Sequence, residues 1–137
     1  MTELELFLNK GNIDICLISE SHLTANAHVK IQGYCCYHAD HPGNRARGGS
    51  AVLVKDSIKH TEDIKIEENS LQATTVNVRL VNKGNFKITA IYCPPREKLK
   101  KQDYVKLFNA LGNNFIAGGD FNAKTKIIIL GFKADLK

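Results

Sequence analysis

The sequence lacks several features that mark special classes of protein. Its longest purely apolar runs, such as Ile127 to Leu130, have only a handful of residues, too few for a transmembrane helix. The N-terminus carries Glu3 and Glu5 where a signal peptide needs positive charge. There is no internal repeat and no linker. These absences predict an intracellular protein with no membrane association.

Metal-binding and disulfide patterns of cysteine are also missing. The four cysteines contain no Cys-x-x-Cys spacing, and the adjacent Cys35 and Cys36 are awkward disulfide partners. Cys16 lies in an apolar run and fits a small core residue. Cys35 and Cys36, with His38 and His41 nearby, could hold a soft metal, but they match no zinc spacing well. We therefore expect reduced, structural thiols.

What is present fits one globular domain with an uneven charge. The chain has 137 residues, of which 43% are hydrophobic and 24% are charged, and this excludes the disordered classes. Residues 1–68 carry a net charge of −3, whereas residues 69–137 carry +8. A surplus of this kind suggests a polyanion such as nucleic acid, although lysines such as Lys98 could simply solvate a surface.

The hydrophobic pattern predicts a mixed α/β domain. Thr2 and Glu5 form a capping box for a short helix that Gly11 ends, and a second helix over 104–111 ends at Gly112. Strands are expected at residues 13–19, 30–37, 50–55, 71–80, 86–92 and 114–117. The first is apolar at nearly every position, as in a strand covered on both faces. A turn at 81–85 predicts an antiparallel hairpin.

Polar side chains appear where three of these strands stop. Glu20 follows the first strand, Tyr92 closes the fifth, and Asp120 with Asn122 follows the last. Rigid strand ends with open loops are where sites collect in layered α/β proteins. Carboxylate, amide and phenol oxygens suit Mg²⁺ or Mn²⁺ and a phosphate ester. Taken singly, each of these residues is explained more simply as a turn residue, a helix cap or an exposed loop residue.

Taken together, segments along nearly the whole chain resemble one family. They are Glu20-Ser21-His22-Leu23-Thr24, Arg47-Gly48-Gly49-Ser50-Ala51, Leu71-Gln72-Ala73-Thr74, Ile91-Tyr92-Cys93-Pro94-Pro95 and Gly118-Gly119-Asp120-Phe121-Asn122-Ala123-Lys124. In this order they resemble the endonuclease domain of jockey-like non-LTR retrotransposons. That domain belongs to the endonuclease/exonuclease/phosphatase superfamily, together with apurinic/apyrimidinic endonucleases and DNase I.

The resemblance implies a Mg²⁺- or Mn²⁺-dependent DNA endonuclease and a role for each matching residue. Glu20 would coordinate the metal, and Asp120 would orient or deprotonate the attacking water. Asn122 would hold that water or a phosphate oxygen, and Tyr92 would donate a hydrogen bond to the phosphate. The DNA backbone would be contacted by basic residues, namely Arg96, Lys98 and Lys124. A parent polyprotein would carry a reverse transcriptase and act in the nucleus; the oligomeric state is left open.

The resemblance also implies a partial version of the family's α/β fold, a four-layer DNase I-like sandwich. We expect residues 1–124 to be a partial endonuclease/exonuclease/phosphatase domain, and residues 125–137 to be a divergent C-terminal tail. The family's first strand with its Asn, and its final Asp-His motif, have no counterpart here. The expectation is therefore a truncated fragment that folds poorly and nicks DNA weakly or not at all alone. The alternatives are a non-catalytic DNA-binding remnant, a phosphatase acting on a small phosphoester, and a functionless pseudogene product.

Overall fold

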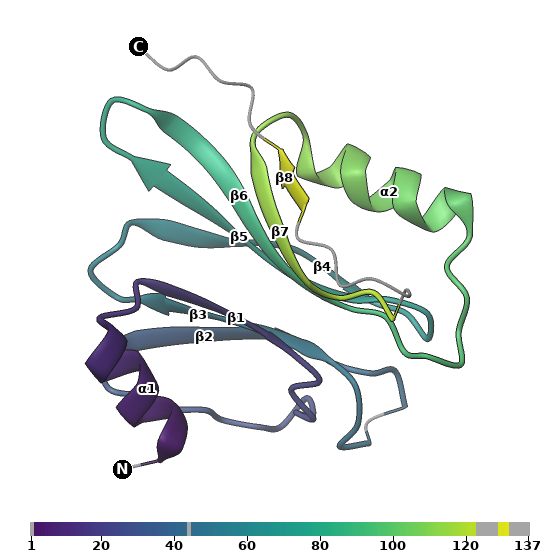
Figure 1. The fold of residues 1–137 in the computed structure, drawn as a ribbon, viewed down its shortest axis with the longest axis horizontal. Coiled ribbons are helices and arrows are strands. Elements are labelled where there is room, and N and C mark those ends of the chain that lie inside the picture. Colours follow the sequence, from purple (N-terminus) through teal and green to yellow (C-terminus); the bar gives the residue numbers. More distant parts are fainter. Residues whose placement is uncertain (1, 44, 123–128, 132–137) are drawn as a thin grey trace.

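The computed structural model describes residues 2–43, 45–122 and 129–131, which form helices and strands in the order that Figure 1 shows. The helices are α1 (Glu3–Gly11) and α2 (Lys101–Leu111). The strands are β1 (Ile15–Ser19), β2 (Tyr34–Ala39), β3 (Ser50–Lys55), β4 (His60–Glu67), β5 (Gln72–Leu80), β6 (Gly84–Tyr92), β7 (Phe115–Asp120) and β8 (Ile129–Gly131). Neither helix of the described part is long and apolar enough to cross a membrane.

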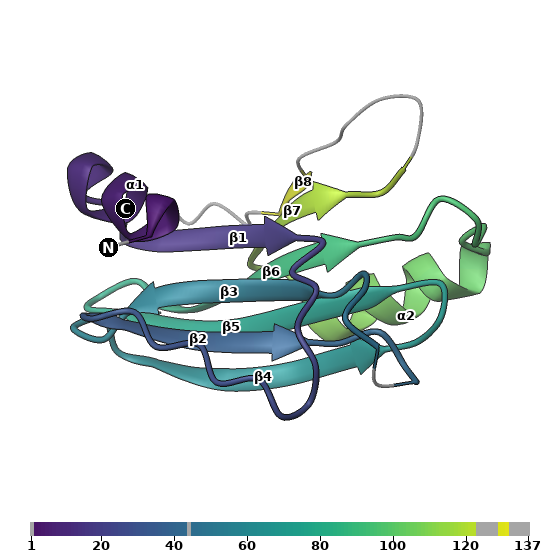
Figure 2. The same ribbon diagram turned by 90° about the horizontal axis from the view of Figure 1, so that it is seen from below.

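The strands form two sheets that pack face to face. One sheet has the order β1-β3-β2 and is antiparallel, and the other has the order β4-β5-β6-β7-β8. In the larger sheet only β6 and β7 pair in parallel. Helix α1 lies on the outer side of the smaller sheet and α2 on that of the larger one (Figures 1 and 2). The result is a four-layer α/β sandwich.

Two apolar clusters hold these layers together. The first lies between the sheets and joins Val52 and Val54 of β3 to residues of β5 and β6 such as Val76 and Ile88. The second lies between the larger sheet and α2, where Leu107 and Leu111 pack against strand residues such as Ile91. Because burial of apolar surface is the main favourable term in folding, these two interfaces fix how the strands are stacked.

The predicted helices are confirmed, with one change at a helix end. The Thr2 side chain accepts from the Glu5 amide (3.2 Å), and the Glu5 carboxylate accepts from the Thr2 amide (2.7 Å), which completes the capping box. Gly11 was expected to end α1 in the left-handed conformation, but that position is taken by Asn12 (φ 47°). Asparagine tolerates this conformation because its short polar side chain relieves part of the steric cost.

The predicted strands are present, but several differ from expectation in their surroundings or limits; β7, for example, continues to Asp120 instead of ending at residue 117. Strand β1 was expected to be covered on both faces, yet all five of its residues are half-buried, because it is an edge strand paired only with β3. Strand β2 begins at Tyr34 rather than residue 30, since Gly33 (φ 84°) makes a tight turn before it. The predicted β5–β6 hairpin is confirmed, with Leu80 paired to Gly84.

Candidate active site

Three strands from both sheets end together and bring the predicted polar residues into one place. Tyr92 ends β6 and Asp120 ends β7, and the two residues are partners in the parallel register. Glu20 follows β1 of the other sheet, and its Oε1 accepts a hydrogen bond from the Tyr92 hydroxyl (2.9 Å). The ends of β1 and β6 point the same way in Figure 2. The structure therefore brings the Tyr92 phenol into hydrogen-bond contact with Glu20 of the other sheet, and Asp120 lies beside Tyr92 on the neighbouring strand.

Ser19, the last residue of β1, links the two sheets by hydrogen bonds next to these residues. Its hydroxyl donates to the Ile91 carbonyl oxygen (2.7 Å) and accepts from the Asp120 amide (3.0 Å). The hydroxyl thus connects the ends of β1, β6 and β7. The sequence analysis did not single out Ser19, although a lone hydroxyl at the end of an apolar run is a usable signal.

The loop that carries Glu20 is held in an unusual backbone conformation. Glu20 (φ 54°) and His22 (φ 56°) both adopt the left-handed region, which is uncommon for residues other than glycine. The loop is fixed by backbone bonds from the Ser21 amide to the Gly49 carbonyl (3.2 Å) and from the His22 amide to the Gly48 carbonyl (2.9 Å). Such conformations persist only where the surroundings impose them, and they cluster at functional sites.

The glycine pair is in turn held by Gln72, a fully buried amide at the start of β5. Its Oε1 accepts from the Gly49 amide (3.1 Å), and its amide nitrogen donates to the Glu68 carbonyl (2.5 Å). A Cβ atom at Gly48 would lie 2.9 Å from Gln72 Oε1, so a larger residue would displace the buried Gln72 amide, and the φ of 57° also disfavours a side chain there. Gln72 pairs in register with Tyr92, which places this support beside the site.

The segment after β7 forms a tight turn around Asp120. The Asn122 amide donates to Asp120 Oδ1 (2.8 Å), and the Asn122 side chain donates to the Cys93 carbonyl oxygen. The Cys93 amide bonds the Asp120 carbonyl (2.9 Å), and Asn122 itself is left-handed (φ 49°). A side-chain oxygen that accepts from the amide two residues on is an Asx turn. The turn fixes the orientation of the Asp120 carboxylate.

Electrostatics keep two nearby groups protonated. Burial raises the pKa of Tyr92 from 10.0 to about 12; the bond to Glu20 and the charge of Asp120 act in the same direction, and Asn122 acts against them. Burial, with the charges of Asp120 and Asp103, likewise raises the pKa of the Cys93 thiol to about 12. Tyr92 is therefore a hydrogen-bond donor at any physiological pH, and Cys93 is no thiolate nucleophile.

A cleft of about 310 Å³ opens beside Tyr92 and Glu20. Its walls come from four loops, and the residues that line it are Glu20, His22, His41, Arg47, Gly48, Asn69, Tyr92, Pro94, Pro95, Arg96 and Glu97. Arg47 was not assigned a site role from the sequence, and His41 was considered only as a soft-metal ligand with Cys35, Cys36 and His38, a grouping that does not form within the described residues. Of the basic residues that were, Arg96 lines the cleft, Lys98 is exposed but does not line it, and Lys124 lies outside the described residues.

The donor set near the cleft fits a hard divalent cation. Glu20 is exposed, and only its Oε1 has a hydrogen-bond partner within the described part of the chain. Asp120 is half-buried and likewise has a partner only at Oδ1. Two carboxylates with free oxygens suit Mg²⁺ or Mn²⁺. No three His, Cys, Asp or Glu side chains gather within residues 2–43 and 45–122 in a way that could hold a metal, so water and substrate oxygens would complete any coordination shell.

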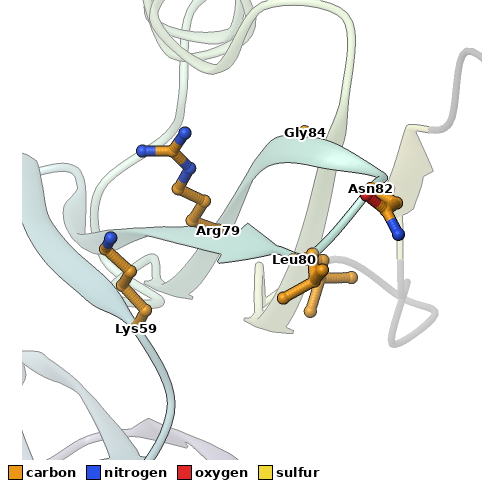
Figure 3. Close-up of a pocket in the computed structure, with 6 residues that line it drawn as sticks. Lys59, Arg79, Leu80, Asn82 and Gly84 are labelled. Carbon is orange, nitrogen blue, oxygen red and sulfur yellow. The ribbon is translucent and has the colours of Figure 1, made fainter.

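The cysteines and a second hollow provide no comparable cluster of reactive groups within the described residues. All four cysteines are free, and Cys16 and Cys36 have a pKa raised by burial. A hollow of about 380 Å³ at the β5–β6 hairpin (Figure 3) is lined by Lys59, Arg79, Leu80, Val81, Asn82 and Gly84. No acid lines it. Because it lies at the opposite end of β6 from Tyr92, roughly 25–30 Å away, it takes no part in the cluster.

Comparison with known proteins places the chain in a family and a fold class. The model of the Endonuclease/Exonuclease/phosphatase family matches residues 1–125. Two curated relatives, named RNA-directed DNA polymerase from mobile element jockey, are 41% (Drosophila funebris) and 40% (Drosophila melanogaster) identical over 122 residues. Each match covers 89% of this chain and 13% of the relative, so the chain spans about an eighth of those proteins' length.

Two solved structures share the fold. One is the endonuclease domain of TRAS1, described as a telomere-specific non-LTR retrotransposon, with a TM-score of 0.68 and 20% identity. The other is the Xenopus laevis APE2 catalytic domain, with a TM-score of 0.59 and 19% identity. The matches cover 90% and 89% of this chain, and 54% of each of the two solved chains. The expected DNase I-like α/β sandwich is confirmed.

Proposed function

The chain belongs to the Endonuclease/Exonuclease/phosphatase family, and from this premise we propose that its strand-end site cleaves phosphodiester bonds of DNA with the help of Mg²⁺ or Mn²⁺. The observation that carries the proposal is the direct link between Glu20 and Tyr92 (2.9 Å), with Asp120 paired to Tyr92 in register. The jockey relatives and the TRAS1 endonuclease domain support a retrotransposon endonuclease over a phosphatase of small phosphoesters.

Each residue has a role that its geometry allows. Asp120 keeps one carboxylate oxygen free, so it can orient a water molecule and accept its proton as the water attacks the phosphorus. Tyr92 stays neutral and can donate its hydroxyl hydrogen to a phosphate oxygen. Asn122 is placed to hold the water or a phosphate oxygen. Glu20, with its free Oε2, would hold the divalent cation.

The bond changes balance with these groups alone on the protein side. Water forms the new P–O bond and its proton passes to Asp120, while the bond from phosphorus to the leaving oxygen breaks. The leaving oxygen takes a proton from solvent to become a hydroxyl group, and Asp120 returns its proton to solvent. A bound Mg²⁺ or Mn²⁺ supplies positive charge that stabilises the developing charge on the phosphate. Arg96, Lys98 and Lys124 are proposed contacts to the DNA backbone. A longer parent protein with a reverse transcriptase is a further part of the proposal, because the jockey relatives are RNA-directed DNA polymerases.

The test is relaxation of supercoiled plasmid by the purified chain in Mg²⁺ and, separately, in Mn²⁺. We expect the chain alone to nick weakly or not at all, so the assay uses a high protein concentration and long incubation. Any nicking that it shows should fall at least ~100-fold in Glu20→Ala and in Asp120→Ala, because each removes a group that acts in the transition state. The matched controls are Asp56→Ala and Glu62→Ala, which remove exposed carboxylates away from the cleft.

The outcomes separate the alternatives. Nicking that survives both site variants would show that the cluster is not catalytic. If wild-type protein binds DNA in a salt-dependent way but nicks it with neither metal, the non-catalytic DNA-binding function is favoured instead. Turnover of small phosphoesters without plasmid nicking would favour a phosphatase.

A further inference from the structure

Gln72, at the start of β5, is an uncharged polar side chain that is completely buried next to the site. Burying an amide costs free energy unless it forms hydrogen bonds, and Gln72 forms two. Its Oε1 accepts from the Gly49 amide (3.1 Å), and its nitrogen donates to the Glu68 carbonyl oxygen. Gly49 precedes β3 of the smaller sheet, and Glu68 follows β4 of the larger one. One side chain therefore ties a loop of the smaller sheet to the larger sheet.

The loop that Gln72 holds is the one that shapes the backbone around Glu20. Glu20 and His22 adopt the left-handed region, which persists only where the surroundings impose it. Backbone amides of this segment bond to the carbonyl oxygens of Gly48 and Gly49 (2.9 and 3.2 Å). Gln72 thus binds the amide of Gly49, while the carbonyl of the same residue holds the segment that carries Glu20.

Gln72 is also a neighbour of Tyr92, the hydrogen-bond partner of Glu20 on the larger sheet. Gln72 and Tyr92 pair in register between β5 and β6. A Cβ atom at Gly48 would lie 2.9 Å from Gln72 Oε1 and 3.5 Å from Tyr92 Cε2, so the Gly48 backbone passes close to both side chains. Gln72 does not line the cleft. It therefore contacts the supports of both partners of the Glu20–Tyr92 bond without reaching a ligand in the cleft.

We propose that Gln72 is a positioning residue, which holds the Gly49 amide and thereby fixes where the Glu20 carboxylate lies relative to Tyr92. This inference rests on the proposed function, because it takes Glu20 to be the ligand of the divalent cation. An apolar side chain of similar length would fill the space but leave the buried Gly49 amide without its partner. Residues that orient a metal ligand strengthen metal binding although they do not touch the metal.

The first test compares amide hydrogen exchange, measured by NMR in EDTA, between the full chain and its Gln72→Met variant. We expect the Ser21 and His22 amides to exchange at least ~10-fold faster in Gln72→Met, because the Gly49 backbone that protects them is no longer held. Thr75→Val is the matched control, since Thr75 is similarly buried in β5 and its hydroxyl bonds to β6. It should leave both exchange rates within about threefold of wild type.

Two further measurements separate positioning from a general effect on stability. When protonated, the side chain of Gln72→Glu offers an O–H donor and a carbonyl acceptor, as the amide does, and burial favours this form. At about pH 5, Gln72→Glu should therefore restore the slow exchange that Gln72→Met loses. Mn²⁺ binding, followed by the relaxation of water protons, should be at least ~10-fold weaker in Gln72→Met and within about twofold of wild type in Thr75→Val.

The outcomes distinguish failure of this inference from failure of the proposed function. If Gln72→Met accelerates exchange at Ser21 and His22 no more than Thr75→Val does, the positioning role is overturned, whatever the metal result. Exchange in Gln72→Glu at acid pH that is as fast as in Gln72→Met would overturn it too. If exchange responds as expected but Mn²⁺ binds equally to wild type and Glu20→Ala, the proposed role of Glu20 fails, and the role of Gln72 at a cation site fails with it.

Discussion

At the residue scale, the site depends on side chains with partners far away in the sequence. The positions of Glu20, Tyr92 and Asp120 where apolar strands stop could be predicted from the sequence, and their chemical roles remain proposals. Ser19 has only its position at the end of an apolar run as a signal, and the contacts that place Ser19 and Gln72 at the site could not be predicted from the sequence. Ser19 acts through Ile91 and Asp120, which are 72 and 101 residues away, and a local pattern does not contain such contacts.

The protonation of Tyr92 gives a prediction at this scale. Its pKa is raised to about 12, so the folded protein holds this proton more strongly than the unfolded chain does. The linked stability is fully present below pH 10 and is lost as the pH rises through about 12. Tyr92→Phe should therefore lose less of its free energy of unfolding than wild type between these values, as measured by urea denaturation at stepped pH.

Tyr104→Phe is the control for the loss of a tyrosine as such, because Tyr104 lies on exposed surface of α2. The comparison of interest is the difference between wild type and Tyr92→Phe at each pH, since other groups titrate equally in both. Curves for wild type and Tyr92→Phe that stay parallel up to pH 12 would show that the Glu20 bond and burial do not hold the proton.

At the element scale, the parallel pairing of β6 and β7 places Tyr92 beside Asp120 and depends on Gly119. An ideal Cβ at Gly119 would lie 1.9 Å from the Ile91 carbonyl oxygen, and its φ of 150° also disfavours a side chain. Gly119→Ala should therefore force β7 away from β6. We expect a loss of about 3 kcal/mol or more in the free energy of unfolding, together with loss of nicking.

Gly118→Ala is a close control for that variant. A Cβ there would meet only the end of the flexible Leu17 side chain, at 3.0 Å, which can shift by a few tenths of an ångström. Chemical denaturation should show a loss of less than about 1.5 kcal/mol for Gly118→Ala. Equal losses for the two variants would contradict the close approach of β7 to the Ile91 carbonyl.

Elements with a strong local signal were predictable, and those defined by pairing were not. The capping box of Thr2 and Glu5 predicted α1, and the turn at 81–85 predicted the β5–β6 hairpin. Strand β4 was missed because its sequence is largely polar and its register shifts between Glu62 and Lys65, which breaks the alternation that identifies a strand. The edge position of β1 depends on which strands pair, and its apolar sequence contains no such information.

At the scale of the whole molecule, the site lies where the two differently charged halves of the chain meet. Glu20 comes from residues 1–68, with a net charge of −3, and Tyr92 and Asp120 come from residues 69–137, with +8. The cluster therefore exists only while the two sheets remain packed together. Any change that weakens the packing between the sheets therefore also disrupts the site.

This coupling predicts the effect of a substitution far from the cleft. Val76 on β5 is fully buried between the sheets, beside Val52 and Val54 of the other sheet. Val76→Ala should lower the free energy of unfolding by about 2 kcal/mol, because it removes buried apolar surface and leaves a cavity. Hydrogen exchange of the slowest amides should accelerate equally in β3 and β6, since neither sheet is stable without the other.

The control makes the same chemical change on the surface. Val81 at the hairpin is 86% exposed, so Val81→Ala should change stability by less than about 0.5 kcal/mol. If Val76→Ala accelerates exchange only in β4 to β7 and leaves β3 protected, the sheets unfold separately and the site can be lost before the fold. Equal acceleration would mean that any change weakening the interface between the sheets also separates Glu20 from Tyr92 and Asp120.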